Sequence, residues 1–189
     1  MLPLILDKTY KNKDYTKHGL SKAEYDNCTF SGCNFEANYL SSISFIACEF
    51  INCNLSNTKL KEVTFKDTIF TDCKMLGMPF YECNPFLLSI TINNCILDFA
   101  NFTNLKLSNT TFMDCSLQQT DFTNCNLSKS NFSNTNLKNA IFEQTNLEGT
   151  NFITAYNFSF RPENNSLKGA KFSKSNIEGL LTVHQITIH

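Results

Sequence analysis

The residues of this chain best suited to chemistry are its cysteines and histidines. The usual zinc spacing Cys-x-x-Cys is absent from the sequence. The three histidines, His18, His184 and His189, lie near the ends, and no nucleophile–base pattern or glycine-rich phosphate loop accompanies them. We therefore expect no catalytic residue, no metal site and no cofactor, and a protein that is not an enzyme. The nine cysteines are Cys28, Cys33, Cys48, Cys53, Cys73, Cys83, Cys95, Cys115 and Cys125.

The spacing of the cysteines follows a period of five. Every fifth residue from Tyr25 to Phe80 is apolar; after a slip of two residues the period resumes at Ile92, and Leu and Phe alternate from Leu97 to Phe152. A helix repeats its apolar residues every three or four positions and a strand every two, so five fits neither. Eight cysteines precede one of these apolar residues by two positions, and Cys83 keeps the same offset from Pro85. This position requires a small, fairly apolar side chain, which predicts buried, reduced thiols rather than disulfides.

Two inward positions in every five describe a chain that turns a corner every five residues. Four corners close a square, so one coil takes twenty residues, and the coils stack at the parallel-strand spacing of about 4.8 Å. Side chains twenty residues apart then form columns, which we expect to fill the core. The predicted columns are Phe102, Phe122 and Phe142 on one wall, Phe112, Phe132 and Phe152 on the opposite wall, and leucines such as Leu97, Leu117 and Leu137 on the other two.

The repeat also suggests boundaries. Residues 1–22 are lysine-rich and are expected to lie outside the repeat as an N-terminal cap, because an open coil edge invites strand pairing. Residues 23–179 form the coil, with a bulge at the slip near 83–90 and an irregular segment at 156–168 that keeps the phase but lacks core residues. We expect the tail, 180–189, to pair with its copy in a second chain; the alternative is that it folds back over the last coil. Its pairing residues would be Leu180, Leu181, Val183, Ile186 and Ile188.

Charge is distributed unevenly along the chain. Residues 23–160 hold 13 acidic and 7 basic side chains, a net charge of −6, whereas residues 1–22 carry +3 and residues 161–189 carry +2. One interpretation is an ordinary solvated surface; the other is an acidic rod that attracts a basic nucleic-acid-binding groove. Direct binding of nucleic acid is not expected, because no basic stripe is present. The candidate partner-binding carboxylates are Glu49, Asp67, Asp72, Glu82, Asp98, Asp114, Asp121 and Glu143.

The repeats resemble a known family. Cys-Asn-Leu-Ser-Lys at 125–129 and Thr-Asn-Leu-Glu-Gly at 145–149 are similar to the A-(D/N)-L-x-x motif of pentapeptide-repeat proteins, and the resemblance covers roughly residues 20–179. It implies an all-β fold, a right-handed quadrilateral parallel β-helix.

A closer resemblance is to Qnr-type quinolone-resistance and microcin-immunity proteins. It rests on the N-terminal cap, the mid-rod slip, the late Tyr-Asn…Pro-Glu-Asn-Asn segment and the Gly-Leu-Leu tail that ends in an apolar strand. This resemblance implies a homodimer that mimics DNA and binds DNA gyrase or topoisomerase IV, protecting it from quinolones or toxins. The long loops of strongly protecting Qnr proteins are replaced here by short insertions.

Two further expectations concern location and role. The apolar start, residues 1–6, is too short for a secretory signal, and no stretch approaches the roughly 20 apolar residues that cross a bilayer. We therefore expect a cytoplasmic protein with no membrane partner. The alternative to a topoisomerase-binding protein is a scaffold or regulatory module that binds another protein.

Overall fold

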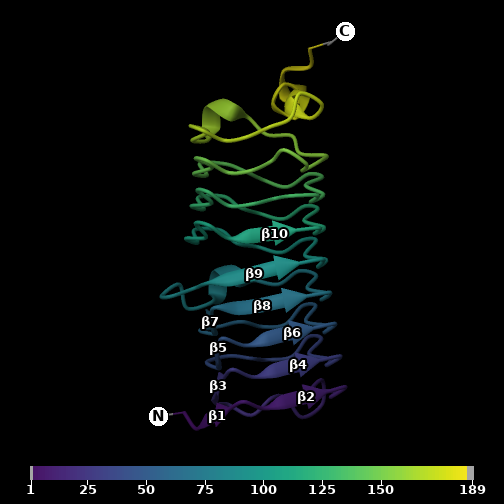
Figure 1. Cartoon of the computed structure of the whole chain (residues 1–189), viewed down its shortest axis with the longest axis vertical. Helices are drawn as coiled ribbons and strands as arrows, with labels where there is room; N and C mark the ends of the chain where they lie inside the picture. Colours follow the sequence, from purple (N-terminus) through teal and green to yellow (C-terminus); the bar gives the residue numbers. More distant parts are fainter. Residues whose placement is uncertain (1, 187–189) are drawn as a thin grey trace.

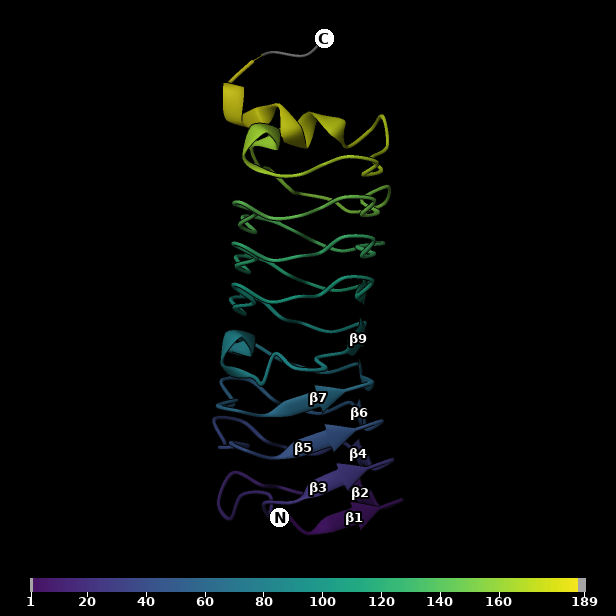
Figure 2. The ribbon, with the colours of Figure 1, turned by 90° about the vertical axis from the view of Figure 1, so that its left-hand side faces the viewer.

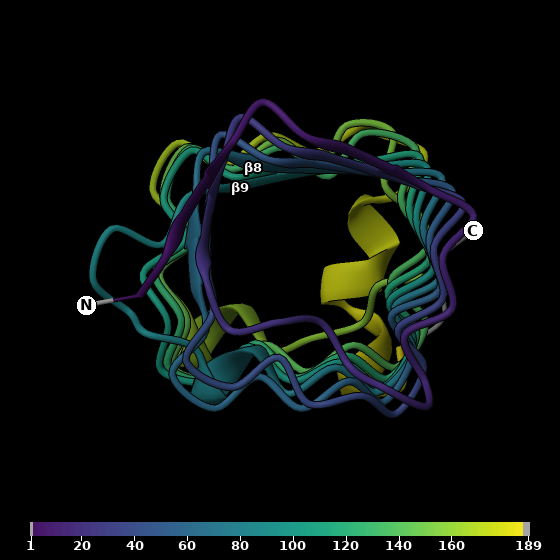
Figure 3. The same ribbon diagram turned by 90° about the horizontal axis from the view of Figure 1, so that it is seen from below.

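The computed structural model describes residues 2–186, and it shows a rod of stacked square coils (Figures 1 and 3). Seen from the N-terminal end, the chain winds clockwise as it recedes, so the β-helix is right-handed (Figure 3). The strands are β1 (Leu4–Leu6), β2 (Thr9–Lys11), β3 (Glu24–Asp26), β4 (Thr29–Ser31), β5 (Ser44–Ile46), β6 (Glu49–Ile51), β7 (Thr64–Lys66), β8 (Thr68–Thr71), β9 (Ile90–Asn93) and β10 (Thr111–Met113). Four short 3₁₀ helices are η1 (Phe80–Glu82), η2 (Pro162–Asn164), η3 (Ile177–Leu180) and η4 (Thr182–His184).

Four walls follow one another around each coil. Wall 1 is the parallel sheet β1-β3-β5-β7, continued above by bridges from Lys106 to Ser166; wall 2 is the six-stranded sheet β10-β9-β8-β6-β4-β2. Wall 3 is a row of single bridges from Asp14 to Tyr156, and wall 4 a row that ends at Ile141. All pairs are parallel and in register at a step of twenty residues, or twenty-two across the slip. The predicted β-helix is therefore the fold of this chain.

Aromatic rings stack in columns through the core. Phe102, Phe122 and Phe142 stack on wall 4 at centroid spacings of 5.2 Å, and Phe112, Phe132 and Phe152 stack on wall 2 at 5.1 Å. Leucines line walls 1 and 3 at the same level. Below the slip the aromatic residues occupy the neighbouring walls 1 and 2 instead, where Tyr25, Phe45 and Phe65 stack beside Phe30, Phe50 and Phe70. The change takes place at Phe80, which contacts Phe65 below and stacks on Phe102 above at 4.4 Å.

The position held by the cysteines is more than a small-residue site. The side chain at this position donates a hydrogen bond to a carbonyl oxygen of the coil below, that of the inward residue 23 positions earlier in the chain. Thr120 Oγ1 donates to Leu97 O at 3.1 Å, Ser130 Oγ to Leu107 O at 2.9 Å, and Cys125 Sγ to Phe102 O at 2.8 Å. Cys, Thr and Ser are the small residues that carry one side-chain donor. Hydrogen bonding therefore explains, together with packing, why these residue types interchange here.

The corners explain the abundance of asparagine. The residue two places after each inward side chain adopts a left-handed backbone in most repeats, with φ between about 50° and 65°, and Asn52, Asn94, Asp114 and Asn134 are examples. Left-handed backbone costs an ordinary L-residue roughly 1–2 kcal/mol, whereas Asn, Asp and Gly adopt it readily. Each coil therefore favours these residues at its corners.

The two-residue slip forms a loop on wall 1. Asn84 N still bonds to Val63 O, but the next coil-to-coil bond on this wall runs from Ser89 N to Phe65 O, so residues 85–87 project outward, while Leu88 packs against the core (Figure 1). Phe86 on this loop is 72% exposed. Wall 2 continues through the slip without interruption, because β8 pairs directly with β9.

The first residues of the chain depart from the prediction. β1 pairs with β3 and β2 with β4, and the rings of Tyr10 and Tyr15 stack on those of Phe30 and Phe35. The expectation that residues 1–22 lie outside the repeat was wrong, since residues 2–22 form a coil of their own. The small-residue positions of this coil hold Pro3, Lys8, Lys13 and His18, all exposed, and no other coil of the described residues covers them.

The top of the rod also differs from the prediction. Phe158 and Phe160 are both buried, so residues 156–168 do contribute to the core, but out of phase with the repeat, whose inward positions would be 157 and 162. The segment η3–η4 lies over this last coil (Figure 2), where Gly179 is so close to Phe158 that a Cβ would fall 2.4 Å from its carbonyl oxygen. Leu180 beside it is buried against the core.

Candidate protein-binding wall

The eight carboxylates proposed from the sequence lie on all four walls or the corners that follow them. Wall 2 carries Glu49, Asp72 and Asp114, and wall 4 carries Glu82, Asp121 and Glu143. Wall 1 carries Asp67, and wall 3 carries Asp98. All eight are exposed or half-buried, so they point outward, but they do not gather into one cluster.

Wall 2 differs from the other walls in charge and in regularity. It is the longest unbroken sheet of the rod, running from β2 through β10. Its outward positions between Lys11 and Lys171, all within the described part of the chain, contain no Lys or Arg. Glu49, Asp72 and Asp114 are therefore the charged groups of this stretch. The result is a flat surface of one sign, about seven coils tall at about 4.8 Å per coil.

Hydrogen bonds from neighbouring coils hold two of these carboxylates in place. Asn94 Nδ2 donates to Asp72 Oδ1 at 2.6 Å, and Asn134 Nδ2 donates to Asp114 Oδ1 at 2.9 Å. All four residues occupy left-handed corner positions between walls 2 and 3, so they stack in a single column. Neither asparagine was predicted from the sequence to belong to the site. Their signal was available, because Asn, Asp or Gly recurs two places after the inward residues of this wall.

The carboxylates of the other walls have varied environments. On wall 4, Thr123 N donates to Asp121 Oδ1 at 2.8 Å and Asn164 Nδ2 donates to Glu143 Oε2 at 2.8 Å. On wall 3, Asp98 accepts from Ser116 Oγ at 2.6 Å and from Gln118 N at 2.9 Å. Wall 4 also carries Lys59 and Lys61 in its lower half, so its charge is mixed. Wall 2 is consequently the best candidate for binding a basic partner.

The cysteines offer no reactive group. All nine are free and buried. Burial raises the pKa of Cys48, Cys115 and Cys125 to about 12, so these thiols stay protonated at neutral pH. Among residues 2–186, no group of three or more His, Cys, Asp or Glu side chains is arranged to hold a metal ion.

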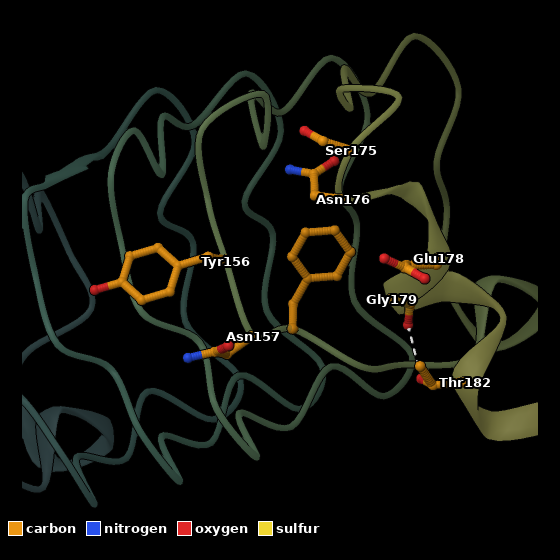
Figure 4. A pocket seen from close by; sticks show the side chains of 8 residues that line it. Tyr156, Asn157, Ser175, Asn176, Glu178, Gly179 and Thr182 are labelled. Carbon is orange, nitrogen blue, oxygen red and sulfur yellow. Dashed lines mark hydrogen bonds between the residues drawn. The ribbon is translucent and has the colours of Figure 1, made fainter.

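A hollow of about 370 Å³ lies between the last coil and the segment η3–η4 (Figure 4). Tyr156 and Asn157 border it on one side, and Asn176, Glu178 and Thr182 on the other. Asn176 Nδ2 donates to Phe152 O at 2.7 Å and to Ala155 O at 2.9 Å, so this side chain joins the residue before η3 to the last coil. The hollow therefore results from the packing of η3–η4 against the end of the coil.

The tail residues proposed for dimerisation have different environments. Leu180 is buried within its own chain, Leu181 and Val183 are half-buried, and Ile186 is 54% exposed. Ile188 and His189 lie outside the described residues. For residues 177–184 the structure agrees with the alternative that the tail folds back over the last coil. A dimer through the tail stays a prediction, and Leu180 exposes only 9% of its surface for such a contact.

No helix in the described part of the chain is both long enough and apolar enough to span a membrane. His18, in the first coil, and His184, in η4, are both exposed.

The fold and its period define the class of protein. The family model described as pentapeptide repeats matches residues 95–134 and 115–152, and the model described as a pentapeptide repeat region matches residues 43–86. The chain belongs to the pentapeptide-repeat family. No curated protein has significant similarity to the chain.

Solved structures of similar fold span almost the whole chain. HetL from the cyanobacterium Nostoc sp. strain PCC 7120, a pentapeptide-repeat protein involved in heterocyst differentiation regulation, is 16% identical, with 90% of this chain and 86% of HetL covered and a TM-score of 0.58. QnrB1, a plasmid-mediated fluoroquinolone resistance protein, is 17% identical, with 97% of this chain and 100% of QnrB1 covered and a TM-score of 0.45. At 16% identity, the similarity to HetL supports the fold alone.

Proposed function

We propose that this protein is a non-catalytic binding protein whose wall 2 takes the place of DNA on a type II topoisomerase, DNA gyrase or topoisomerase IV, and protects it from quinolones or toxins. The observation that carries this proposal is the long acidic face without basic side chains between Lys11 and Lys171. A basic groove that normally holds a duplex would attract such a face and tolerate its straight outline.

Charge density sets the strength expected of this attraction. A net charge of −6 over residues 23–160, at about 4.8 Å per coil, is about one negative charge per 5–6 Å of rod. Duplex DNA carries one per about 1.7 Å. The rod is thus roughly three times less charged than DNA along its axis, so electrostatics favours encounter and orientation, and direct contacts must supply much of the affinity.

The choice of a type II topoisomerase as partner rests on the sequence resemblance to Qnr-type and microcin-immunity proteins. The uninterrupted wall 2 supports this choice, because a continuous acidic face can lie along a basic groove that binds DNA. The protein would act in the cytoplasm, where its partner works.

A supercoiling assay tests the proposal. Purified gyrase is inhibited with a fluoroquinolone, and the protein is titrated from below to well above the enzyme concentration. We expect supercoiling to recover as the protein is added, and the same titration without drug reports any direct inhibition. No recovery at any stoichiometry, with either gyrase or topoisomerase IV, would reject the proposal.

A second candidate is a scaffold or regulatory module that binds a different protein. Ile69, Met113 and Ile153 favour it, because they place exposed apolar side chains among the carboxylates of wall 2, which imitation of a phosphate backbone does not need. A binding experiment with immobilised protein and purified gyrase separates the two. If gyrase does not bind to the immobilised protein, and one other defined protein is retained on it, the second candidate is favoured.

A further inference from the structure

Two residues in left-handed corner positions are large and apolar. Most such positions hold Asn, Asp, Gly or a small or polar residue, but Leu87 and Phe99 have φ values of 62° and 64°. Their side chains are 55% and 58% exposed. The backbone conformation disfavours a bulky side chain, and its exposure removes the gain from burial. Residues that carry both disadvantages mark places where a side chain serves something other than folding.

Further exposed apolar residues lie on the walls on either side of Phe99, in the same coil or the coil below, whereas Leu87 belongs to the projecting loop. It lies at the corner between walls 3 and 4, directly above Gly77 in register. Ile96 on wall 3 is 46% exposed and Tyr81 on wall 4 is 50% exposed, with the half-buried Pro79 beside it. We call Pro79, Tyr81, Ile96 and Phe99 the Phe99 corner.

The position of Ile96 is polar in the neighbouring coils. The residues bridged to it along wall 3 are Lys74 below and Ser116 above, and Asn54 and Asn136 follow them. An isoleucine in this row is therefore an exception, located in the same coil as the strained phenylalanine. Two independent departures from the pattern of the rod thus coincide on one patch.

The side of the Phe99 corner that faces wall 2 is mainly acidic. Asp98 is fixed next to Phe99 by the bonds from Ser116 and Gln118, and Asp72 and Asp114 lie at the other edge of wall 3, with Lys74 below Ile96. On wall 4 the charge is mixed, because Glu82 and Asp121 are balanced by Lys59 and Lys61 one coil below Pro79 and Tyr81. A protein segment that presents an apolar side chain next to Lys or Arg fits the apolar centre and its acidic side.

We propose that the Phe99 corner is the apolar anchor of the partner that wall 2 attracts, so the inference rests on the proposed function and deepens it. Wall 3 joins the two sites. Asp72 and Asp114 stand at the corner between walls 2 and 3, and Phe99 stands at the corner between walls 3 and 4. A partner lying across wall 3 contacts the fixed carboxylates at one edge and the aromatic ring at the other.

The substitution Phe99→Asn tests this assignment, because asparagine suits the left-handed backbone and removes the ring. The matched control is Ile141→Asn, which removes another exposed apolar side chain from wall 4, away from the Phe99 corner. Affinity for purified gyrase is measured by calorimetry, thermal unfolding by circular dichroism and oligomeric state by sedimentation. We expect Phe99→Asn to unfold at the same or a higher temperature and to bind at least tenfold more weakly, and Ile141→Asn to bind within threefold of the unchanged protein.

Each other result would overturn the inference. If Phe99→Asn binds gyrase as tightly as the unchanged protein, Phe99 is not an anchor, but the proposed function is unaffected. If Ile141→Asn loses as much affinity as Phe99→Asn, the effect is not specific to the Phe99 corner. A lower unfolding temperature for Phe99→Asn would make the residue structural. A dimer that disappears in Phe99→Asn would identify a second copy as the occupant. If the unchanged protein does not bind gyrase, the inference fails together with the proposed function.

Discussion

The ring of Phe122 lies almost parallel to that of Phe102 one coil below, with 5.2 Å between the centroids and 8° between the planes. This pair shows how the rod is held together, because the same relationship is repeated along wall 2 and wall 4. Each ring contacts the rings above and below it, and meets the ring of the opposite wall edge to face, as Phe122 meets Phe112 at 5.8 Å. Both arrangements are favourable for aromatic pairs.

Removing one ring from a column should therefore be costly. Phe122→Ala leaves a cavity between two coils that cannot close without breaking their register, so we expect the free energy of unfolding to fall by about 3–5 kcal/mol. Denaturant unfolding measures it. Ile141→Ala, at the exposed outward position of the same wall, is the control and should change stability by less than about 0.5 kcal/mol. A near-neutral Phe122→Ala would place the ring outside the core.

The donor in the small-residue position is tested at Thr120. Thr120→Val keeps the shape but loses the bond to Leu97 O, so we expect a loss of about 1 kcal/mol. Thr120→Cys keeps a donor of the kind used elsewhere in the rod and should cost less. If valine and cysteine are equally tolerated, packing alone determines this position.

Corner residues that suit the backbone poorly can be improved. Ala47 is exposed and has a φ of 48°, so Ala47→Asn should raise the free energy of unfolding by up to about 1 kcal/mol. The same change at Ala100, which is 1% exposed, places a polar side chain in the core and should destabilise. Thermal unfolding of both variants makes the comparison. A destabilised Ala47→Asn would contradict the account of the corners.

The buried thiols make stability depend on alkaline pH. Their ordinary pKa is 9.0, and burial raises the pKa of Cys48, Cys115 and Cys125 to about 12. Between pH 9 and pH 12 the unfolded chain loses these protons while the folded chain keeps them, so each thiol lowers the stability by about 1.4 kcal/mol per pH unit. Below pH 9 this contribution is fully retained.

Urea unfolding at pH 8, 9, 10 and 11 measures the alkaline effect. The control is Cys125→Ser, which keeps a donor, removes one titrating group and should give a shallower slope above pH 9. Stability that is constant up to pH 11 would show that the thiols are not buried in solution.

The core could be predicted from the sequence because a period of five is visible without alignment. Once a coil is taken to be twenty residues long, the spacing of the residues from Leu97 to Phe152 shows which of them share a column. The first coil escaped prediction because Lys8 and Lys13 occupy positions that are small elsewhere, and these positions are exposed in the structure. Phe158 and Phe160 escaped prediction because they fill the core out of phase with the repeat, which tertiary packing decides.

The candidate wall was less accessible to sequence reasoning, although part of the signal was present. Assigning outward positions to four walls from the period alone would have shown that the wall of Glu49, Asp72 and Asp114 lacks basic residues. Asn94 and Asn134 could have been recognised as corner residues from the same assignment. The position of the projecting loop on wall 1, which leaves wall 2 unbroken, depends on how the slip is accommodated and needs the structure.

The most direct measurement compares two variants of equal charge in binding to purified gyrase. One neutralises wall 2 with Glu49→Gln, Asp72→Asn and Asp114→Asn, and the other neutralises wall 1 with Glu24→Gln, Asp67→Asn and Glu148→Gln. Both change the net charge by +3, and asparagine can still accept the bonds from Asn94 and Asn134. We predict at least tenfold weaker binding for the wall 2 variant and less than threefold for the wall 1 variant. Equal losses in both, or no loss in the wall 2 variant, would contradict the assignment of wall 2 as the binding surface.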